Sequence, residues 1–177
     1  MTNTTEMEYE LTFLLAEIPS EAKEISGITM EDSYLPNDLA VHPRLRIRRK
    51  GDEYFLTKKT PVSEGDASAH LEQTIKLDRA EYDALREAST RRVSKTRYAV
   101  SIAGHECEVD VFDGMLTGLA LIDFEFESKD AMSRFEAPDI CGADVTQENF
   151  IAGGLLAGRS IDDIKTELDR LGYDGIA

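Results

Sequence analysis

Pairs of carboxylates two residues apart are the feature of this 177-residue sequence with the clearest chemical potential. The pairs are Glu8 with Glu10, Glu108 with Asp110, and Asp123 with Glu125. Residues two apart on a β-strand point to the same face, so each pair would present two carboxylates side by side. Crowded carboxylates repel one another, and a divalent cation such as Mg²⁺ removes that penalty. The pairs therefore indicate either a metal site or an ordinary solvated strand face.

Basic residues follow the same spacing. Arg46 and Arg48 share one strand face, Lys59 lies on the facing hairpin strand, and Lys95 and Arg97 share another face. Guanidinium groups grip phosphate oxygens bidentately, and an ammonium group adds a compact point charge. Converging inside a closed tube, these groups would suit three linked phosphates. Facing water, they would form surface ion pairs that contribute roughly 0–1 kcal/mol each.

The elements that must position these residues are mostly strands, because apolar and charged residues alternate along short runs. Strands are expected at 6–15, 44–49, 53–59, 70–77, 91–101, 106–112 and 119–127, with a strand or extended connection at 30–36. Helices are expected at 21–25, from 78 onward, at 128–135 and at 160–172. Asp78 followed by Glu81 is typical of a capping box. The pattern predicts an α+β protein with an antiparallel sheet or barrel, in one domain spanning 1–177 with a C-terminal helical segment at about 147–172.

Composition limits the possible partners. There are 35 acidic and 20 basic residues, a formal net charge of −15, which is the opposite of what a nucleic-acid-binding protein normally carries. An anionic substrate must therefore be captured by a local basic cluster or by bound cations. The two cysteines lack metal-ligand spacing, and the first residues contain no apolar stretch. We expect a cytoplasmic protein without a membrane segment, either a monomer or a homodimer.

In their order and spacing, these segments resemble the motifs of the CYTH family, the triphosphate tunnel metalloenzymes. Residues 8–14 are similar to its ExExK motif, residues 45–48 and 53–59 to its LRLR hairpin, and residues 91–98 to its RxxxKxR segment. Residues 108–112 and 121–126 resemble its two acidic strands, and residues 144–146 its EVT turn. The resemblance covers most of the chain.

The resemblance implies an eight-stranded antiparallel tunnel with helices packed outside. It implies divalent-metal-dependent hydrolysis of inorganic triphosphate or an organic triphosphate such as thiamine triphosphate, with Mg²⁺ or Mn²⁺ as cofactor. Metal would be held by Glu8, Glu10, Asp110, Asp123 and Glu125. The phosphates would be held by Arg46, Arg48, Lys59 and Arg97. Lys95 would orient or activate the attacking water, with Glu72 nearby.

Three motifs depart from the family pattern. Thr12 replaces the lysine of ExExK, His70 and Thr74 replace two charged residues of an R-x-E-x-E strand, and no basic residue follows 144–146. Losing one preorganised charged donor can cost about 2–4 kcal/mol at the transition state. Two alternatives to the hydrolase therefore stay open: a non-catalytic or weakly catalytic module that binds polyphosphate or nucleotide, and an adenylyl cyclase that makes cyclic AMP from ATP. A plain sheet protein with solvated charged faces is the third.

Overall fold

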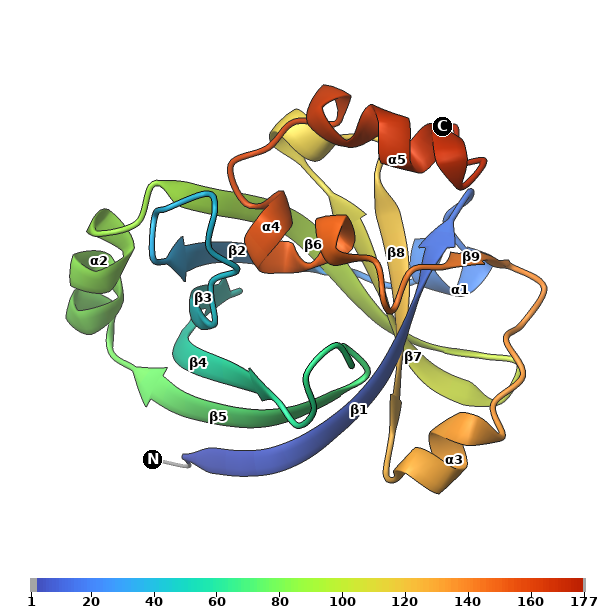
Figure 1. Ribbon diagram of the computed structural model, residues 1–177, viewed down its shortest axis with the longest axis horizontal. Helices are drawn as coiled ribbons and strands as arrows, with labels where there is room; N and C mark the ends of the chain where they lie inside the picture. The colour runs from blue at the N-terminus through green and yellow to red at the C-terminus, as the bar shows by residue number, and fades with distance from the viewer. Residues whose placement is uncertain (1–2, 177) are drawn as a thin grey trace.

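A computed structural model describes residues 3–176, and its strands form one antiparallel sheet (Figure 1). The strands are β1 (Thr4–Leu15), β2 (Ile28–Leu35), β3 (Leu45–Lys50), β4 (Glu53–Pro61), β5 (Ala69–Leu77), β6 (Arg91–Ile102), β7 (His105–Phe112), β8 (Ala120–Phe126) and β9 (Cys141–Asp144). The α-helices are α1 (Ser20–Lys23), α2 (Arg79–Glu87), α3 (Lys129–Ser133), α4 (Gly153–Leu156) and α5 (Lys165–Arg170). Short 3-10 helices span Gly114–Leu116, Asn149–Ile151 and Asp162–Ile164.

The sheet closes into a barrel through its first strand. The strand order is β5-β4-β3-β2-β6-β7-β8-β1-β9, and β1 also pairs with β5, from Thr4 opposite Thr74 to Tyr9 opposite Ala69. Strands β1 to β8 thus form a closed eight-stranded antiparallel barrel, which confirms the predicted fold class. The short β9 adds to β1 beyond the end of β5, with Phe13 opposite Asp144.

The alternation along each strand decides which side chains enter the barrel. Ile47, Val109 and Ile122 are fully buried on the outer face. The charged residues between such apolar residues lie on the opposite parity and line an interior cavity. The ionic faces therefore point inward, and the reading of these strands as an ordinary solvated sheet is wrong.

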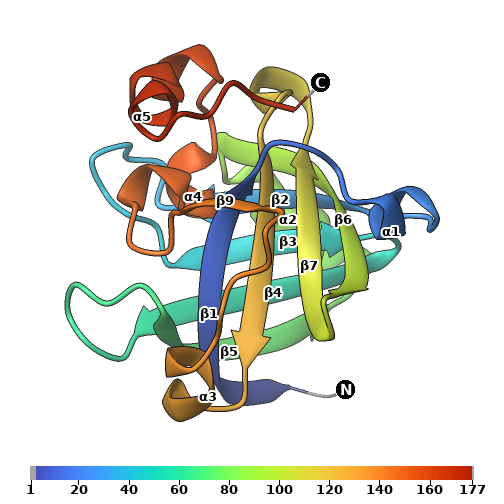
Figure 2. The same ribbon diagram turned by 90° about the vertical axis from the view of Figure 1, so that its right-hand side faces the viewer.

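One end of the barrel is apolar and carries the C-terminal segment. Leu14, Phe112 and Leu121, on the inward parity of their strands, pack in one core cluster with Leu156 and Leu168 of the segment that follows β9. Figures 1 and 2 both show α5 at the top of the molecule and α3 at the bottom, with α4 between them. The C-terminal segment is therefore part of the main core.

A buried guanidinium fastens this segment to the loop between β2 and β3. Arg91, at the start of β6, is 2% exposed and donates hydrogen bonds to the carbonyl oxygens of Asp38 (2.8 Å), Val41 (2.9 Å) and Gly154. Gly154 packs tightly here, because a Cβ on it would lie 2.6 Å from the ring of Pro43. The loop and α4 therefore form one wall beside the cavity.

Most predicted elements are present, and the differences lie after residue 138. The capping box of α2 is formed, with Glu81 N–H donating to Asp78 and Asp78 N–H donating to Glu81, both at 2.8 Å. The last predicted helix is instead a 3-10 helix followed by α5, which ends before Gly172 at φ +69°. Strand β9 was not predicted, and α4 lies within the helical segment expected at about 147–172 but was not placed individually, since the glycine-containing sequences of both elements carry no clear period. Within residues 3–176, no helix is long and apolar enough to cross a membrane.

Candidate active site

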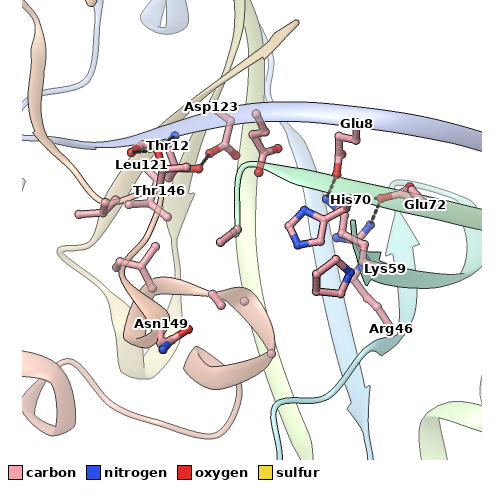
Figure 3. A pocket seen from close by; sticks show the side chains of 18 of the residues that line it. Glu8, Thr12, Arg46, Lys59, His70, Glu72, Leu121, Asp123, Thr146 and Asn149 are labelled. Atoms are coloured by element: carbon pink, nitrogen blue, oxygen red, sulfur yellow. Dashed lines mark hydrogen bonds and ion pairs between the residues drawn. The ribbon is translucent and has the colours of Figure 1, made fainter. Parts of the chain in front are cut away.

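All site residues expected from the sequence line one cavity inside the barrel, with a volume of about 810 Å³. They are Glu8, Glu10, Arg46, Arg48, Lys59, Glu72, Lys95, Arg97, Asp110, Asp123 and Glu125. Figure 3 shows Glu8, Lys59 and Glu72 gathered on one side of this space, and Thr12 beside Asp123 on the other. Acidic side chains outnumber basic ones in the lining. The cavity thus favours cations unless a bound cation reverses its sign.

Strand register concentrates the carboxylates on the wall formed by β7, β8 and β1. Glu10 lies directly opposite Glu125, and Glu108 directly opposite Asp123. Like charges in directly opposed positions destabilise a sheet. In a stable barrel with this register, the negative charges of these carboxylates must therefore be neutralised by protons, by basic neighbours or by a metal ion.

Three of these carboxylates form a cluster suited to a cation. One oxygen from each of Glu8, Glu10 and Glu125 lies within 4.8 Å of the others. Oxygen ligands of this type suit hard divalent ions such as Mg²⁺. The other two expected metal ligands, Asp110 and Asp123, lie outside this cluster and have partners within the protein. Asp110 accepts from Arg97 at 2.7 and 2.6 Å, and Asp123 accepts from Thr12 at 2.8 Å.

The basic residues come from β3, β4 and β6. Lys59 stands opposite Glu72 and forms ion pairs with Glu72 (3.4 Å) and with Glu8. Lys95 and Arg97 both pair with Asp110, and Arg97 also pairs with Glu108. Most cations of the cavity are therefore already engaged with carboxylates that a metal ion would compete for.

The two arginines of β3 differ sharply. Arg48 donates from Nε and Nη2 to the two oxygens of Asp32, both at 2.7 Å. Arg46 reaches only Glu72, at 3.8 Å, and its Nε is buried without a hydrogen-bond partner among residues 3–176. Arg46 is thus a cavity-lining cation with unused donors.

Burial and mutual repulsion raise the pKa values of carboxyl groups on the wall formed by β7, β8 and β1, which we call the acidic wall. Burial, with the neighbouring charges of Glu10 and Asp110, raises the pKa of Asp123 to about 8. Burial, with Glu108 and Glu8, raises the pKa of Glu125 to about 7. These carboxyls hold protons near neutral pH and would release them to a bound metal ion.

Ion pairs lower the pKa values of carboxyl groups beside the basic residues of β3, β4 and β6, which we call the basic wall. Burial would raise the pKa of Asp110, but Lys95 and Arg97 lower it to about 2. Burial likewise opposes the ionisation of Glu72, yet Lys59 and Arg46 lower the pKa of Glu72 below its usual value. Burial and then Arg97 lower the pKa of Lys95, against the attraction of Asp110. Lys95 therefore gives up a proton more readily than an ordinary lysine.

The positions that depart from the family motifs carry neutral groups. Thr12 donates to Asp123, and its backbone N–H donates to Thr146 Oγ1 at 3.0 Å. Thr74 donates to Glu72 at 3.0 Å and contacts the hydroxyl of Thr57 at 2.9 Å. Burial and Lys59 lower the pKa of His70, which keeps this imidazole neutral at pH 7. Hydroxyl groups thus orient two carboxylates where the family motifs have charges.

Asp32 and Glu108 also line the cavity: the sequence reasoning named Glu108 as the neighbour of Asp110 without giving it a role, and it did not single out Asp32. Glu108 shares a face with Asp110, so its position was available from the spacing. Asp32 was not recognisable, because Glu31 and Asp32 are adjacent and either could face inward. Only the observed pairing of Asp32 with Arg48 across β2 and β3 decides the direction.

The comparisons with known proteins agree with this geometry. No family model matches the chain. It is 38% identical over 154 residues to an inorganic triphosphatase of Nitrosomonas europaea, covering 85% of this chain and 96% of that protein. A crystal structure of an inorganic triphosphatase aligns with a TM-score of 0.61 and 34% identity, over 85% of this chain and 93% of that one. A putative adenylate cyclase of Bacillus halodurans shares the fold, with a TM-score of 0.54 and 19% identity over 92% of this chain and 97% of that one. The chain belongs to the CYTH family of triphosphate tunnel metalloenzymes.

Proposed function

We propose that this protein hydrolyses inorganic triphosphate, or a small molecule that carries a triphosphate, inside the barrel with the aid of Mg²⁺ or Mn²⁺. One observation supports this most strongly: a single cavity joins a cluster of three carboxylates to cations from three strands. In such a lining, the basic residues can balance the charge of a polyanion while the carboxylates balance the charge of a divalent ion. The inorganic triphosphatase relative supports the same reaction.

The acidic wall would hold the metal. Glu8, Glu10 and Glu125 are the proposed ligands, because their oxygens already converge, and Asp110 and Asp123 extend the set. A divalent ion bound there would neutralise phosphate charge as the anhydride bond breaks. The residues fit such an ion, since Lys59 offsets their mutual repulsion only in part and the pKa values of Glu8 and Glu125 stay raised.

The basic wall would bind and orient the phosphates. Arg46 has free donors, and Lys59 and Arg97 gain them when their carboxylate partners turn to a cation. Positioning and charge neutralisation supply most of the rate in phosphoryl transfer. Arg48 would also contribute positive charge, although two of its donors already engage Asp32.

Lys95 and Glu72 are proposed to manage the attacking water and its surroundings. Lys95 lies beside Arg97 and has a lowered pKa, so its amine can orient water and exchange a proton near the phosphate. Glu72 is held ionised by Lys59 and Arg46, and Thr74 fixes one of its oxygens. Glu72 therefore suits positioning of these cations better than proton donation.

Phosphate release tests the proposal directly. The purified protein should release phosphate from triphosphate in Mg²⁺ or Mn²⁺, and EDTA should stop the reaction. Glu10→Ala should abolish it, because one member of the carboxylate cluster is lost. Glu53→Ala is the matched control, since Glu53 is an exposed glutamate on β4 outside the cavity.

No phosphate release above a buffer blank with any of several triphosphates would contradict the hydrolase. Calorimetry then separates the remaining possibilities. Triphosphate binding without turnover would favour a binding module, for which the neutral Thr12, His70 and Thr74 are the motivating observation. Absence of binding would remove both readings.

A further inference from the structure

Arg44 is a cation of the cavity lining that has no role in the function proposed above. It directly precedes β3, and it shares the inward parity of that strand with Arg46 and Arg48, so all three arginines line the cavity. The exposed fraction of these side chains increases toward the start of the strand, from 11% for Arg48 to 16% for Arg46, and Arg44 is exposed. The cavity therefore meets solvent beside Arg44.

The backbone places Arg44 beside another cation of the site. The carbonyl oxygen of Arg44 accepts from the N–H of Lys59 at 3.1 Å, which continues the register in which Leu45 stands opposite Lys58. Arg44 and Lys59 are thus cross-strand neighbours that line the same cavity. Figure 3 shows Lys59 and Arg46 on one side of this space. For a phosphate chain held by Lys59 and Arg46, Arg44 is the next cation toward solvent.

The guanidinium of Arg44 is free. The other cations of the cavity have carboxylate partners: Arg46 and Lys59 pair with Glu72, Arg48 pairs with Asp32, and Lys95 and Arg97 pair with Asp110. Arg44 forms neither an ion pair nor a side-chain hydrogen bond within residues 3–176. Because the neighbouring Lys59 carries the same charge, an anion between the two side chains would relieve their repulsion and accept hydrogen bonds from both.

Two imidazoles line the same cavity and respond to the charge of Arg44. Burial and then Arg44 lower the pKa of His42 to about 4. Burial, Lys59 and Arg44 lower the pKa of His70 below its usual value, against the charge of Glu10. Both rings are therefore neutral at pH 7. Arg44 thus supplies positive charge where these two side chains supply only neutral rings.

We propose that Arg44 is a further phosphate-binding residue, which captures the anionic substrate where the cavity opens and holds the phosphate group nearest to solvent. The formal net charge of −15 repels anions at long range, so capture requires exposed positive charge that is continuous with the cations inside. Arg44 meets both conditions, since it is exposed and adjoins Lys59. This inference rests on the proposed function, because it assumes that the cavity takes a phosphate chain.

The test compares two arginines on opposite faces of one strand. Arg49 is the matched control for Arg44: its side chain is 42% exposed, lies 4.0 Å from Glu31 and does not line the cavity. Arg44→Gln and Arg49→Gln change the net charge equally, so only the position of the lost charge differs. Arg44→Lys keeps the charge at its place.

Binding and turnover are measured separately. Calorimetry in Mg²⁺ with a methylene-bridged analogue of triphosphate gives the affinity without hydrolysis, and it is repeated at several KCl concentrations. Phosphate release from triphosphate gives KM and kcat. Thermal melting reports the folding of each variant.

Arg44→Gln should weaken the analogue by about 3- to 10-fold, less than a fully buried charged hydrogen bond would, because solvent screens part of the interaction. KM should increase by a similar factor with kcat nearly unchanged, since the lost contact binds substrate and transition state alike. The affinity of Arg44→Gln should also fall less steeply with KCl than that of the wild type. Arg44→Lys should keep most of the affinity, and Arg49→Gln should match the wild type.

Three results would overturn the inference. Equal weakening by Arg44→Gln and Arg49→Gln would assign the effect to net charge alone. An unchanged affinity of Arg44→Gln would show that the guanidinium does not contact phosphate. A lower kcat with an unchanged KM would show that Arg44 does not act in capture. If Arg44→Gln fails to fold, Arg44→Met, which keeps the aliphatic stem of the side chain, decides in its place.

The same measurements separate this inference from the proposed function. Wild-type protein that binds the analogue but releases no phosphate from triphosphate contradicts the hydrolase and leaves the role of Arg44 to be judged by affinity. Wild-type protein that does not bind the analogue contradicts both.

Discussion

The inside of this barrel divides into two regions that the same strands build. On β7, Asp110 belongs to the charged region, and Phe112, two residues later on the same face, belongs to the apolar core. On β8, Leu121 lies in the core and Asp123 in the charged region. Parity along a strand thus decides whether a side chain enters the barrel, while position along the strand decides whether it serves chemistry or stability.

The two regions should respond differently to substitution. Residues of the charged region are costly to bury and are retained for binding, so removing one should affect turnover more than folding. Residues of the apolar end are closely packed under α4 and α5, so removing one should affect folding more than turnover. Each of the following experiments tests one side of this contrast.

The largest effect on activity is expected for Arg46→Ala. Loss of a preorganised donor should lower kcat/KM for triphosphate by about 10²- to 10³-fold. The melting temperature should change little, because Arg46 makes a single ion pair with the part of the chain that the structure describes, at 3.8 Å. Arg79→Ala, which removes an exposed guanidinium on α2, serves as the control. An Arg46→Ala protein with wild-type kcat/KM would show that the free donors do not contact the substrate.

The largest effect on stability is expected for Leu156→Ala in α4. Leu156 is fully buried in the core at the apolar end, and truncating it should lower the free energy of unfolding by about 2–5 kcal/mol. Denaturant unfolding measures this change. KM for triphosphate, measured well below the melting temperature, should stay close to the wild-type value. Leu39→Ala is the control, because Leu39 is 62% exposed. A raised KM without lost stability would contradict the division into two regions.

The stabilisation of the folded protein by a bound metal ion should increase with pH. The folded-state pKa values of Asp123 and Glu125, about 8 and about 7, exceed their ordinary values, so the folded protein binds more protons than the unfolded chain. The metal-free protein should therefore lose stability as pH rises from about 4 to about 8. Since protons compete with the metal for these oxygens, Mg²⁺ should raise the melting temperature more at pH 8.5 than at pH 6. Glu125→Gln should reduce the difference between the two pH values. An equal rise in the melting temperature of the wild type at both pH values would contradict the prediction.

The smallest effect is expected for Thr12→Val, which deletes the hydrogen bond to Asp123 but keeps the shape of the side chain. A net loss of about 1 kcal/mol corresponds to a several-fold weaker apparent affinity for the metal ion. Thr12→Ser restores the hydroxyl and should restore the affinity. Equal affinities for the valine and serine variants would show that Thr12 does not orient Asp123.

Much of the barrel was predictable because charged and apolar residues alternate along its strands. Charged and apolar residues alternate so strictly at 106–111 and 122–127 that both strand positions and faces follow from period two. Whether the charged face turns inward was not decided by the pattern, since a solvated face has the same period. The resemblance to a tunnel family favoured the inward direction, and the buried Asp110 and Asp123, which line the interior cavity, confirm it.

What could not be predicted depends on contacts between distant strands. Asp32 lies in a run where polar residues of both parities occur, so only its pairing with Arg48 shows that it faces the cavity. The convergence of Glu8 and Glu125 depends on the register of β1 against β8. Strand β9 was missed because Gly142 and Asp144 are poor strand formers, and pairing with β1 compensates for them.

The buried side chain of Arg91 has a practical consequence for anyone who shortens this protein. Its guanidinium donates one hydrogen bond to the Gly154 carbonyl and others to carbonyls of the loop after β2. Deleting residues 154–177 would leave one donor of this buried guanidinium without its acceptor and would remove the contacts that hold the cavity-lining loop containing His42 against α4. A trimmed version should therefore fail as a catalyst and as a folded protein together, even though every proposed ligand remains in its sequence.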